Sequence, residues 1–211
     1  MKRSALLSIF SIVFFAFSCD SNDDTSNSPV LDGFTHNNVF YETPNAYIEI
    51  DEDDNNTFPD NYTIFFTDGR MYDNDLNVNG SSGDYLFSLN TTKLVFLQIE
   101  ASDNPSLNGL GLQPNTSYVV SNQDSVIIYN AQIDALNPSF FINNVEFGVG
   151  NENAGVINTP NNASSTITFT EINIDTNNLL NSTIEADYIF INQVGESITG
   201  TYKGTFGLIL D

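Results

Sequence analysis

From residue 31 onward, apolar and polar side chains alternate in short stretches rich in valine, isoleucine, tyrosine, phenylalanine and threonine. In one such stretch, Ile167 and Phe169 alternate with Thr168 and Thr170. A period of two residues is typical of a strand that buries one face. Stretches of this kind predict strands over residues 39–43, 47–50, 62–67, 85–89, 94–100, 117–120, 125–133, 140–149, 165–174, 183–191 and 197–210.

Turn-forming residues separate these stretches, as in the segments 67–69, 113–115 and 159–162, and no window has a helical period. Short strands at regular spacing predict an all-β fold, an antiparallel β-sandwich, with a β-barrel-like sandwich as the alternative. The stretch 197–210 carries three glycines among threonine, tyrosine and phenylalanine. Glycine inside a strand predicts a bulge or the close approach of another chain segment.

The first residues follow a different pattern. Lys2 and Arg3 precede an apolar run over residues 5–17, and Ser18 and Cys19 follow it. A basic start, an apolar run and a small residue before the cut are the parts of a secretory signal peptide. The run is shorter than the roughly 20 residues that span a bilayer. We therefore expect residues 1–18 to be a signal peptide that is removed before Cys19.

Cys19 is the only cysteine of the chain. A cysteine directly after the cut resembles the lipobox of bacterial lipoproteins, which implies a lipid on its thiol. Ala16 and Ser18 also fit ordinary signal peptidase cleavage, so the alternative is a freely secreted protein. That alternative leaves an exposed thiol without an intramolecular partner in an oxidising compartment, and lipidation is the preferred interpretation.

Acidic residues follow the cysteine at once, at Asp20, Asp23 and Asp24. A lipidated cysteine followed by acidic residues resembles the export signal of Bacteroidota-type surface lipoproteins. The resemblance implies an outer-membrane protein that faces the outside of the cell. Residues 19–30 are polar and predict a flexible acidic tether, which leaves residues 31–211 for a single β-sandwich domain.

Charge limits the partners. The chain has 27 acidic residues against five lysines and arginines, and a net charge of −22. Nucleic-acid backbones and anionic membrane surfaces are bound by clusters of lysine and arginine, which this chain lacks. We therefore expect no nucleic-acid partner, and attachment to the membrane through the lipid anchor at Cys19.

Oxygen donors recur at alternate positions in the segment 75–80, as in the first half of a calcium-binding loop. Leu86 stands where such a loop needs a bidentate glutamate, so Asp84, with Asp68 or Asp73, would have to substitute. Asn-Gly at 79–80 is also the commonest dipeptide of a tight hairpin turn. Calcium is therefore the alternative to a chain without cofactors, and its predicted ligands are Asp75, Asn77, Asn79 and Asp84.

Catalytic motifs are scarce. His36 is the only histidine and lies in a polar stretch, and no nucleophile elbow is present. Paired carboxylates for glycan hydrolysis remain an alternative, although no pair stands out. Tryptophan is absent, so tyrosines are the candidate platforms for a glycan: Tyr41, Tyr72, Tyr118, Tyr129, Tyr188 and Tyr202.

The sequence as a whole favours a surface lipoprotein with a non-catalytic binding or structural role towards a glycan or a protein. The alternatives are a hydrolase that uses a pair of carboxylates on glycans, and an adhesive domain stabilised by calcium.

Overall fold

The computed structural model describes residues 31–51, 60–73, 85–101, 111–121, 125–134, 140–142, 144–151, 155–158 and 164–210. These residues form strands and one short 3₁₀ helix, and none of the described helices is both long and apolar enough to cross a membrane. The elements are β1 (Gly33–His36), β2 (Val39–Glu42), β3 (Asn45–Asp51), β4 (Asp60–Thr67), β5 (Met71–Asp73), β6 (Tyr85–Ser88), β7 (Leu94–Ala101), β8 (Thr116–Val119), β9 (Val126–Ile128), β10 (Gln132–Asp134), β11 (Phe140–Ile142), β12 (Val145–Asn151), β13 (Val156–Asn158), β14 (Thr166–Asn173), η2 (Leu179–Asn181), β15 (Thr183–Ile191) and β16 (Ser197–Leu210).

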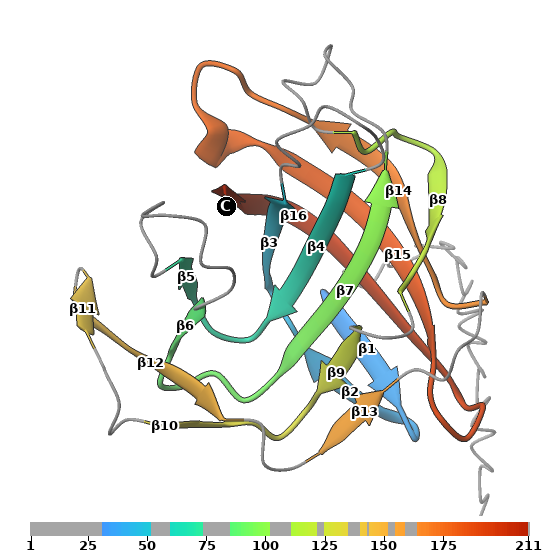
Figure 1. Ribbon diagram of the computed structural model, residues 1–211, viewed down its shortest axis with the longest axis horizontal. Coiled ribbons are helices and arrows are strands. Elements are labelled where there is room, and N and C mark those ends of the chain that lie inside the picture. The colour runs from blue at the N-terminus through green and yellow to red at the C-terminus, as the bar shows by residue number, and fades with distance from the viewer. Residues whose placement is uncertain are drawn as a thin grey trace, which may run out of the picture.

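The described strands form two sheets that pack against each other, as Figure 1 shows. The larger sheet has the order β13-β9-β7-β4-β3-β16-β15-β14-β8, and the β1–β2 hairpin joins it through β16. The smaller sheet has the order β10-β12-β6-β5, with β11 beside β12. The predicted all-β sandwich is therefore confirmed. Its strand pairs are antiparallel with one exception, because β3 runs parallel to the last part of β16.

Strand β4 shows how the two sheets share the core. Ile64 and Phe66 face the main hydrophobic cluster, which lies within the curve of the larger sheet. Phe65 points the other way, to a second cluster that includes Met71 and Phe87 of the smaller sheet. Both faces of β4 are thus buried at its centre, where three apolar residues, Ile64, Phe65 and Phe66, follow one another without a polar residue between them.

The larger sheet curves back towards itself. Just after β8, the Ser121 backbone N–H donates to the Gln98 carbonyl of β7 at 2.7 Å, although β8 and β7 lie far apart in the strand order. The curve encloses aromatic and aliphatic side chains from both halves of the sheet. It gives the sandwich some of the character of the barrel-like alternative.

The glycines of β16 allow side chains from neighbouring strands to lie against its backbone. Gly200 pairs with Tyr188, and a Cβ atom at residue 200 would lie 2.0 Å from the Tyr188 ring. Gly207 pairs with Tyr47, whose ring would lie 2.6 Å from an added Cβ. The close approach predicted from the glycines is confirmed at both positions.

Three short strands, β1, β5 and β13, are absent from the sequence prediction, and two predicted strands are divided. The stretch 125–133 bends at Tyr129, because the chain leaves the larger sheet after β9 and enters the smaller one at β10. The stretch 140–149 is a hairpin, with Asn144 at a φ of 66° in its turn.

The chain joins the sandwich at Leu31 and Asp32, directly after the predicted tether. The Leu31 carbonyl accepts a hydrogen bond from the Thr201 hydroxyl at 3.3 Å. The Asp32 carboxylate accepts one from the Lys203 backbone N–H at 2.7 Å, and its carbonyl accepts one from Thr43 N–H at 3.0 Å. These contacts join Leu31 and Asp32 to β16 and to the residue after β2, while the predicted tether lies outside the described residues.

Candidate functional site

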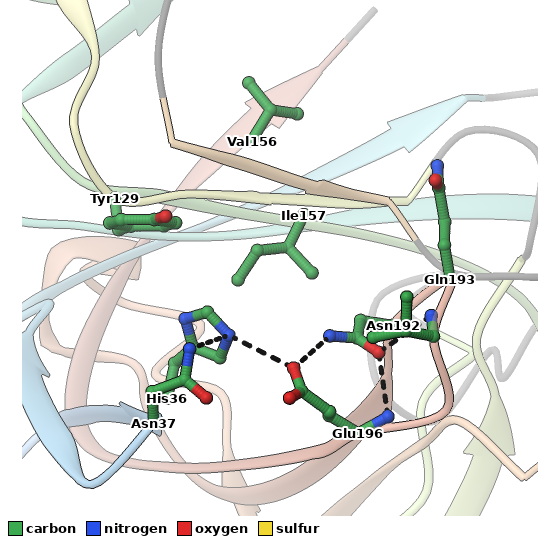
Figure 2. Close-up of a pocket in the computed structure, with 9 residues that line it drawn as sticks. His36, Asn37, Tyr129, Val156, Ile157, Asn192, Gln193 and Glu196 are labelled. Carbon is green, nitrogen blue, oxygen red and sulfur yellow. Dashed lines mark hydrogen bonds and ion pairs between the residues drawn. The ribbon is translucent and has the colours of Figure 1, made fainter.

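An open cavity of about 320 Å³ lies where four segments meet: the β1–β2 turn, the bend after β9, strand β13 and the β15–β16 loop. This volume is near the lower end of the range for small-ligand sites. Figure 2 shows apolar side chains on one side of the cavity and polar ones on the other. The lining consists of His36, Asn37, Tyr129, Val156, Ile157, Asn192, Gln193, Val194 and Glu196.

His36 reaches the cavity from the last position of β1. The next two residues, Asn37 and Asn38, both have positive φ, at 50° and 62°. Two positive values define a type I′ turn, which asparagine tolerates better than most residues and which joins the strands of a tight hairpin. The hairpin buries His36 to 9% exposure. His36 therefore belongs to a strand and not to a polar linker.

The β15–β16 loop positions the carboxylate. The Asn192 side-chain oxygen accepts hydrogen bonds from the backbone N–H groups of Val194 and Glu196 at 3.1 and 2.8 Å. The Asn192 amide nitrogen donates to Glu196 Oε2 at 2.8 Å. Asn192 is only 6% exposed, so a buried amide holds both the loop backbone and the Glu196 side chain in place.

His36 and Glu196 face each other, with 3.7 Å between Nε2 and Oε2. Asn37 Nδ2 lies 3.1 Å from the same imidazole nitrogen. A neutral ring with its proton on Nδ1 accepts the Asn37 hydrogen bond, whereas a protonated ring directs a donor at Glu196. The cavity thus has a carboxylate beside an imidazole, and the Glu196 side chain is 51% exposed.

Tyr129 forms the aromatic wall. Its ring centroid lies 5.6 Å from the His36 ring and 5.3 Å from the Tyr41 ring. Tyr41 in turn stacks on Phe34 at 5.1 Å, so a chain of rings connects the cavity to the core. Within the described part of the chain, the Tyr129 hydroxyl has no hydrogen-bond partner.

The six candidate tyrosines separate into core and cavity residues. Tyr188 and Tyr202 are buried at 2% and 3% exposure. Tyr41 and Tyr118 pack against the main cluster, and Tyr72 lies against Phe147 at 6.3 Å. Tyr129 lines the cavity, so it is the candidate platform that the structure favours.

The predicted calcium ligands Asp75, Asn77, Asn79 and Asp84 lie outside the described residues, as does Cys19. Asp68, a candidate additional ligand, is among the described residues, and both of its carboxylate oxygens already accept hydrogen bonds from the backbone and side chains of Thr92 and Lys93. In the described ranges, no group of three or more His, Cys, Asp or Glu side chains is placed to hold a metal.

The cavity brings together residues that the sequence analysis did not connect. No sequence motif points to Asn37, Asn192 or Glu196 as part of a site, and His36 carries no sequence signal beyond a possible catalytic role. The Asn37-Asn38 pair between two apolar stretches is the signal that would have predicted the hairpin. The contact between His36 and Glu196 had no such signal, because it joins opposite ends of the chain.

Chemically, the lining supplies one carboxylate, one imidazole, amide groups and a phenol. Glycoside hydrolysis by the usual route needs two carboxyl groups on either side of the bond, and among the described residues of this lining Glu196 alone carries a carboxylate. The arrangement is therefore suited to hydrogen bonding of a ligand. No protein-family model, no curated protein and no solved structure was found to match this chain.

Proposed function

We propose that this protein is a lipid-anchored surface lipoprotein whose β-sandwich binds a small ligand without catalysing a reaction. The cavity is the observation that supports ligand binding, because the buried Asn192 amide holds the Glu196 carboxylate opposite the Tyr129 ring. The carboxylate held in this way is half exposed, so it stays accessible to a ligand. The sequence around Cys19 carries the anchoring part.

The placement of the cavity supports this proposal. The predicted tether joins the sandwich at Leu31 and Asp32, just before the Gly33 end of β1, whereas the cavity lies at the His36 end. Three residue steps along a strand separate these ends by about 10 Å. A chain of about ten tether residues adds at most roughly 35 Å. The cavity would therefore stay accessible on a protein held at the membrane.

Intact-mass analysis of the membrane-bound protein tests the anchor. We expect a mature chain that starts at Cys19 and carries acyl groups. The Cys19→Ala variant should lose the lipid and leave the membrane fraction. An acyl-free native protein in the medium would contradict the anchor, and would leave ligand binding at the cavity as a separate question.

Surface exposure has its own control. Replacing Asp20, Asp23 and Asp24 by alanine keeps Cys19, so this variant should remain lipidated. We expect it to lose exposure on the cell surface, measured by protease digestion of intact cells, because the acidic residues after the cysteine resemble the export signal. Equal digestion of both forms would show that these residues act only as a tether.

The calcium prediction stays open to a direct test. Calcium that binds the folded state stabilises it by mass action, so the melting temperature should rise with millimolar calcium and Asp75→Ala should abolish the rise. The matched control is Asp187→Ala, an exposed residue of β15 outside the predicted loop. A melting temperature that does not respond to calcium would remove the adhesive-domain alternative in its calcium-stabilised form.

A further inference from the structure

The polar wall of the cavity offers donors and acceptors side by side. Glu196 Oε2 is bound by Asn192, whereas Oε1 has no partner among the described residues. The Asn192 amide uses one N–H on Glu196 and keeps a second. An acceptor and a donor therefore lie next to each other, and His36 adds a third polar group beside them.

The opposite wall is apolar. Ile157 is buried, and Figure 2 shows it pointing towards the polar side chains, with the Tyr129 ring to one side. Val156, 39% exposed, lies at the margin of the cavity and points to the other face of β13. Val194, 80% exposed, adds an apolar rim at the tip of the β15–β16 loop. A ligand that fills this cavity must show an apolar face to one wall and hydrogen-bonding groups to the other.

Charge narrows the class of ligand. The described residues of the lining include no lysine or arginine, and the whole chain carries a net charge of −22, which disfavours an anion. Glu196 is half exposed and already hydrogen-bonded, so solvent screens its attraction for a cation. The remaining polar groups are neutral amides, an imidazole and a phenol, which suit an uncharged ligand with several hydroxyls.

We infer that the cavity binds one uncharged sugar residue of a glycan, and this inference rests on the proposed binding function. The C–H face of the sugar lies against Tyr129 and Ile157. Two hydroxyls on neighbouring carbons contact the polar wall, where one donates to Glu196 Oε1 and the other accepts from the Asn192 amide. The small, open cavity suits a single ring that stays joined to a longer glycan outside.

His36 makes the test direct, because it is the only histidine and its ring lines the cavity. We would label histidine with ¹³C in the full, detergent-solubilised protein and follow the imidazole signal by NMR. The probes are the methyl glycosides of glucose, galactose and N-acetylglucosamine, with glucuronate as the anionic control and choline as the cationic one. We expect at least one neutral glycoside to shift the His36 signal saturably, and glucuronate and choline not to shift it.

Three variants assign the contacts. Tyr129→Ala and Glu196→Ala should each weaken binding of the neutral glycoside by about tenfold or more. Glu171→Ala, an exposed carboxylate on β14 away from the cavity, should leave binding unchanged within about twofold. Melting temperatures measured alongside would show whether each variant is folded. If Tyr129→Ala is not folded, Tyr129→Leu replaces it, because leucine restores apolar volume without the aromatic ring.

The contrary outcomes are distinct. A shift caused only by choline or glucuronate would overturn the sugar as the ligand class and leave binding at the cavity intact. Glycoside binding without a His36 shift, or without loss in Tyr129→Ala and Glu196→Ala, would place the site elsewhere. No shift with any probe at millimolar concentration would overturn both the sugar and the cavity as the ligand site, while the lipid anchor keeps its own test.

Discussion

Tyr188 and Tyr129 illustrate two uses of the same residue in this protein. Tyr188 lies in the core, stacked on Phe66 at 5.4 Å and pressed against Gly200. Tyr129 lies at the bend after β9, half-buried, with its ring against the cavity. Core side chains surround the Tyr188 ring, whereas one face of the Tyr129 ring is open to the cavity. A tyrosine-rich strand pattern therefore shows where tyrosines occur along a strand, but not which of them lie in the core and which line a cavity.

Their hydroxyl groups differ in the same way. The Tyr188 hydroxyl is buried, and within the described residues it has no hydrogen-bond partner. Burial raises the pKa of Tyr188, and the neighbouring Thr43 hydroxyl offsets this only in part. The Tyr129 hydroxyl, by contrast, lies at the surface of an open cavity where solvent or a ligand can satisfy it.

The largest loss of stability is expected at Gly200, where the Tyr188 ring lies against the backbone of β16. Gly200→Ala places a Cβ 2.0 Å from the Tyr188 ring, so we expect a loss of about 3 kcal/mol in the free energy of unfolding. The control is Gly195→Ala in the β15–β16 loop, where no atom lies within 4 Å but φ is 85°. That change should cost about 1 kcal/mol through backbone strain alone. Chemical denaturation measures both, and equal losses would mean that the Tyr188 ring moves aside.

Next in size is the polar support of the cavity. Asn192→Ala removes the acceptor for two loop N–H groups and the donor to Glu196. We expect a loss of about 2 kcal/mol in stability, and weaker ligand binding because Glu196 is no longer held. Gln193→Ala, an exposed neighbour in the same loop, should change stability by less than about 0.5 kcal/mol. A variant of Asn192 as stable as that of Gln193 would show that the loop holds its shape without the buried amide.

Alkaline pH should weaken the core selectively. Burial raises the pKa of Tyr202 to about 12, with a further rise from the nearby charge of Asp32. Below pH 10 the folded and unfolded states both hold the phenol proton, so stability is complete. Between pH 10 and 12 the unfolded state loses the proton first, and stability falls as pH rises, by an amount on the order of 1 kcal/mol.

Denaturation curves across this pH range would measure the fall, and Tyr202→Phe should reduce it. The remaining dependence then reports on Tyr188, whose pKa is also raised by burial. A slope that Tyr202→Phe leaves unaltered would show that its hydroxyl, which donates to the Thr205 carbonyl, is more accessible than its burial suggests.

The smallest changes in stability are expected when either tyrosine loses its hydroxyl. Tyr188→Phe removes a buried hydroxyl that has no described partner, so we expect stability to stay level or rise by up to about 1 kcal/mol. Tyr129→Phe should change stability by less than about 0.5 kcal/mol and keep ligand binding within about twofold, because the ring that contacts the sugar remains. Melting temperatures and the His36 NMR titration measure the pair. A destabilised Tyr188→Phe would mean that its hydroxyl is satisfied after all.

Much of the fold was predictable because strands are local. Alternation predicted β14 and β15 closely, and the glycines of β16 predicted close contact before any partner was known. The errors arose where the chain changes sheet or turns tightly. The break at Tyr129 follows from the passage between sheets, and β1 was missed because four residues before an Asn-Asn turn carry little periodic signal.

The candidate site was much less predictable. Tyr129 was one of six equivalent tyrosines, and only its position at a bend between sheets exposes its face. Glu196 was one of many acidic residues, and it acquires a partner because β15 and β16 form a hairpin whose loop reaches β1. Such contacts depend on the pairing of strands that are far apart in the sequence, and this pairing cannot be inferred from the local pattern of residues.

Composition and local periodicity were enough to predict the all-β class and the position of most strands. The sequence also supplied the acidic charge and the prediction of a lipidated start at Cys19. These properties depend on composition and on short-range periodicity, which a linear chain displays in full. Long-range packing fixed three further features: β3 runs parallel to β16, Tyr188 lies in the core, and His36, Tyr129 and Glu196 share one cavity. The physical reason is that burial and side-chain contact depend on which strands become neighbours, and the global packing of both sheets makes that choice.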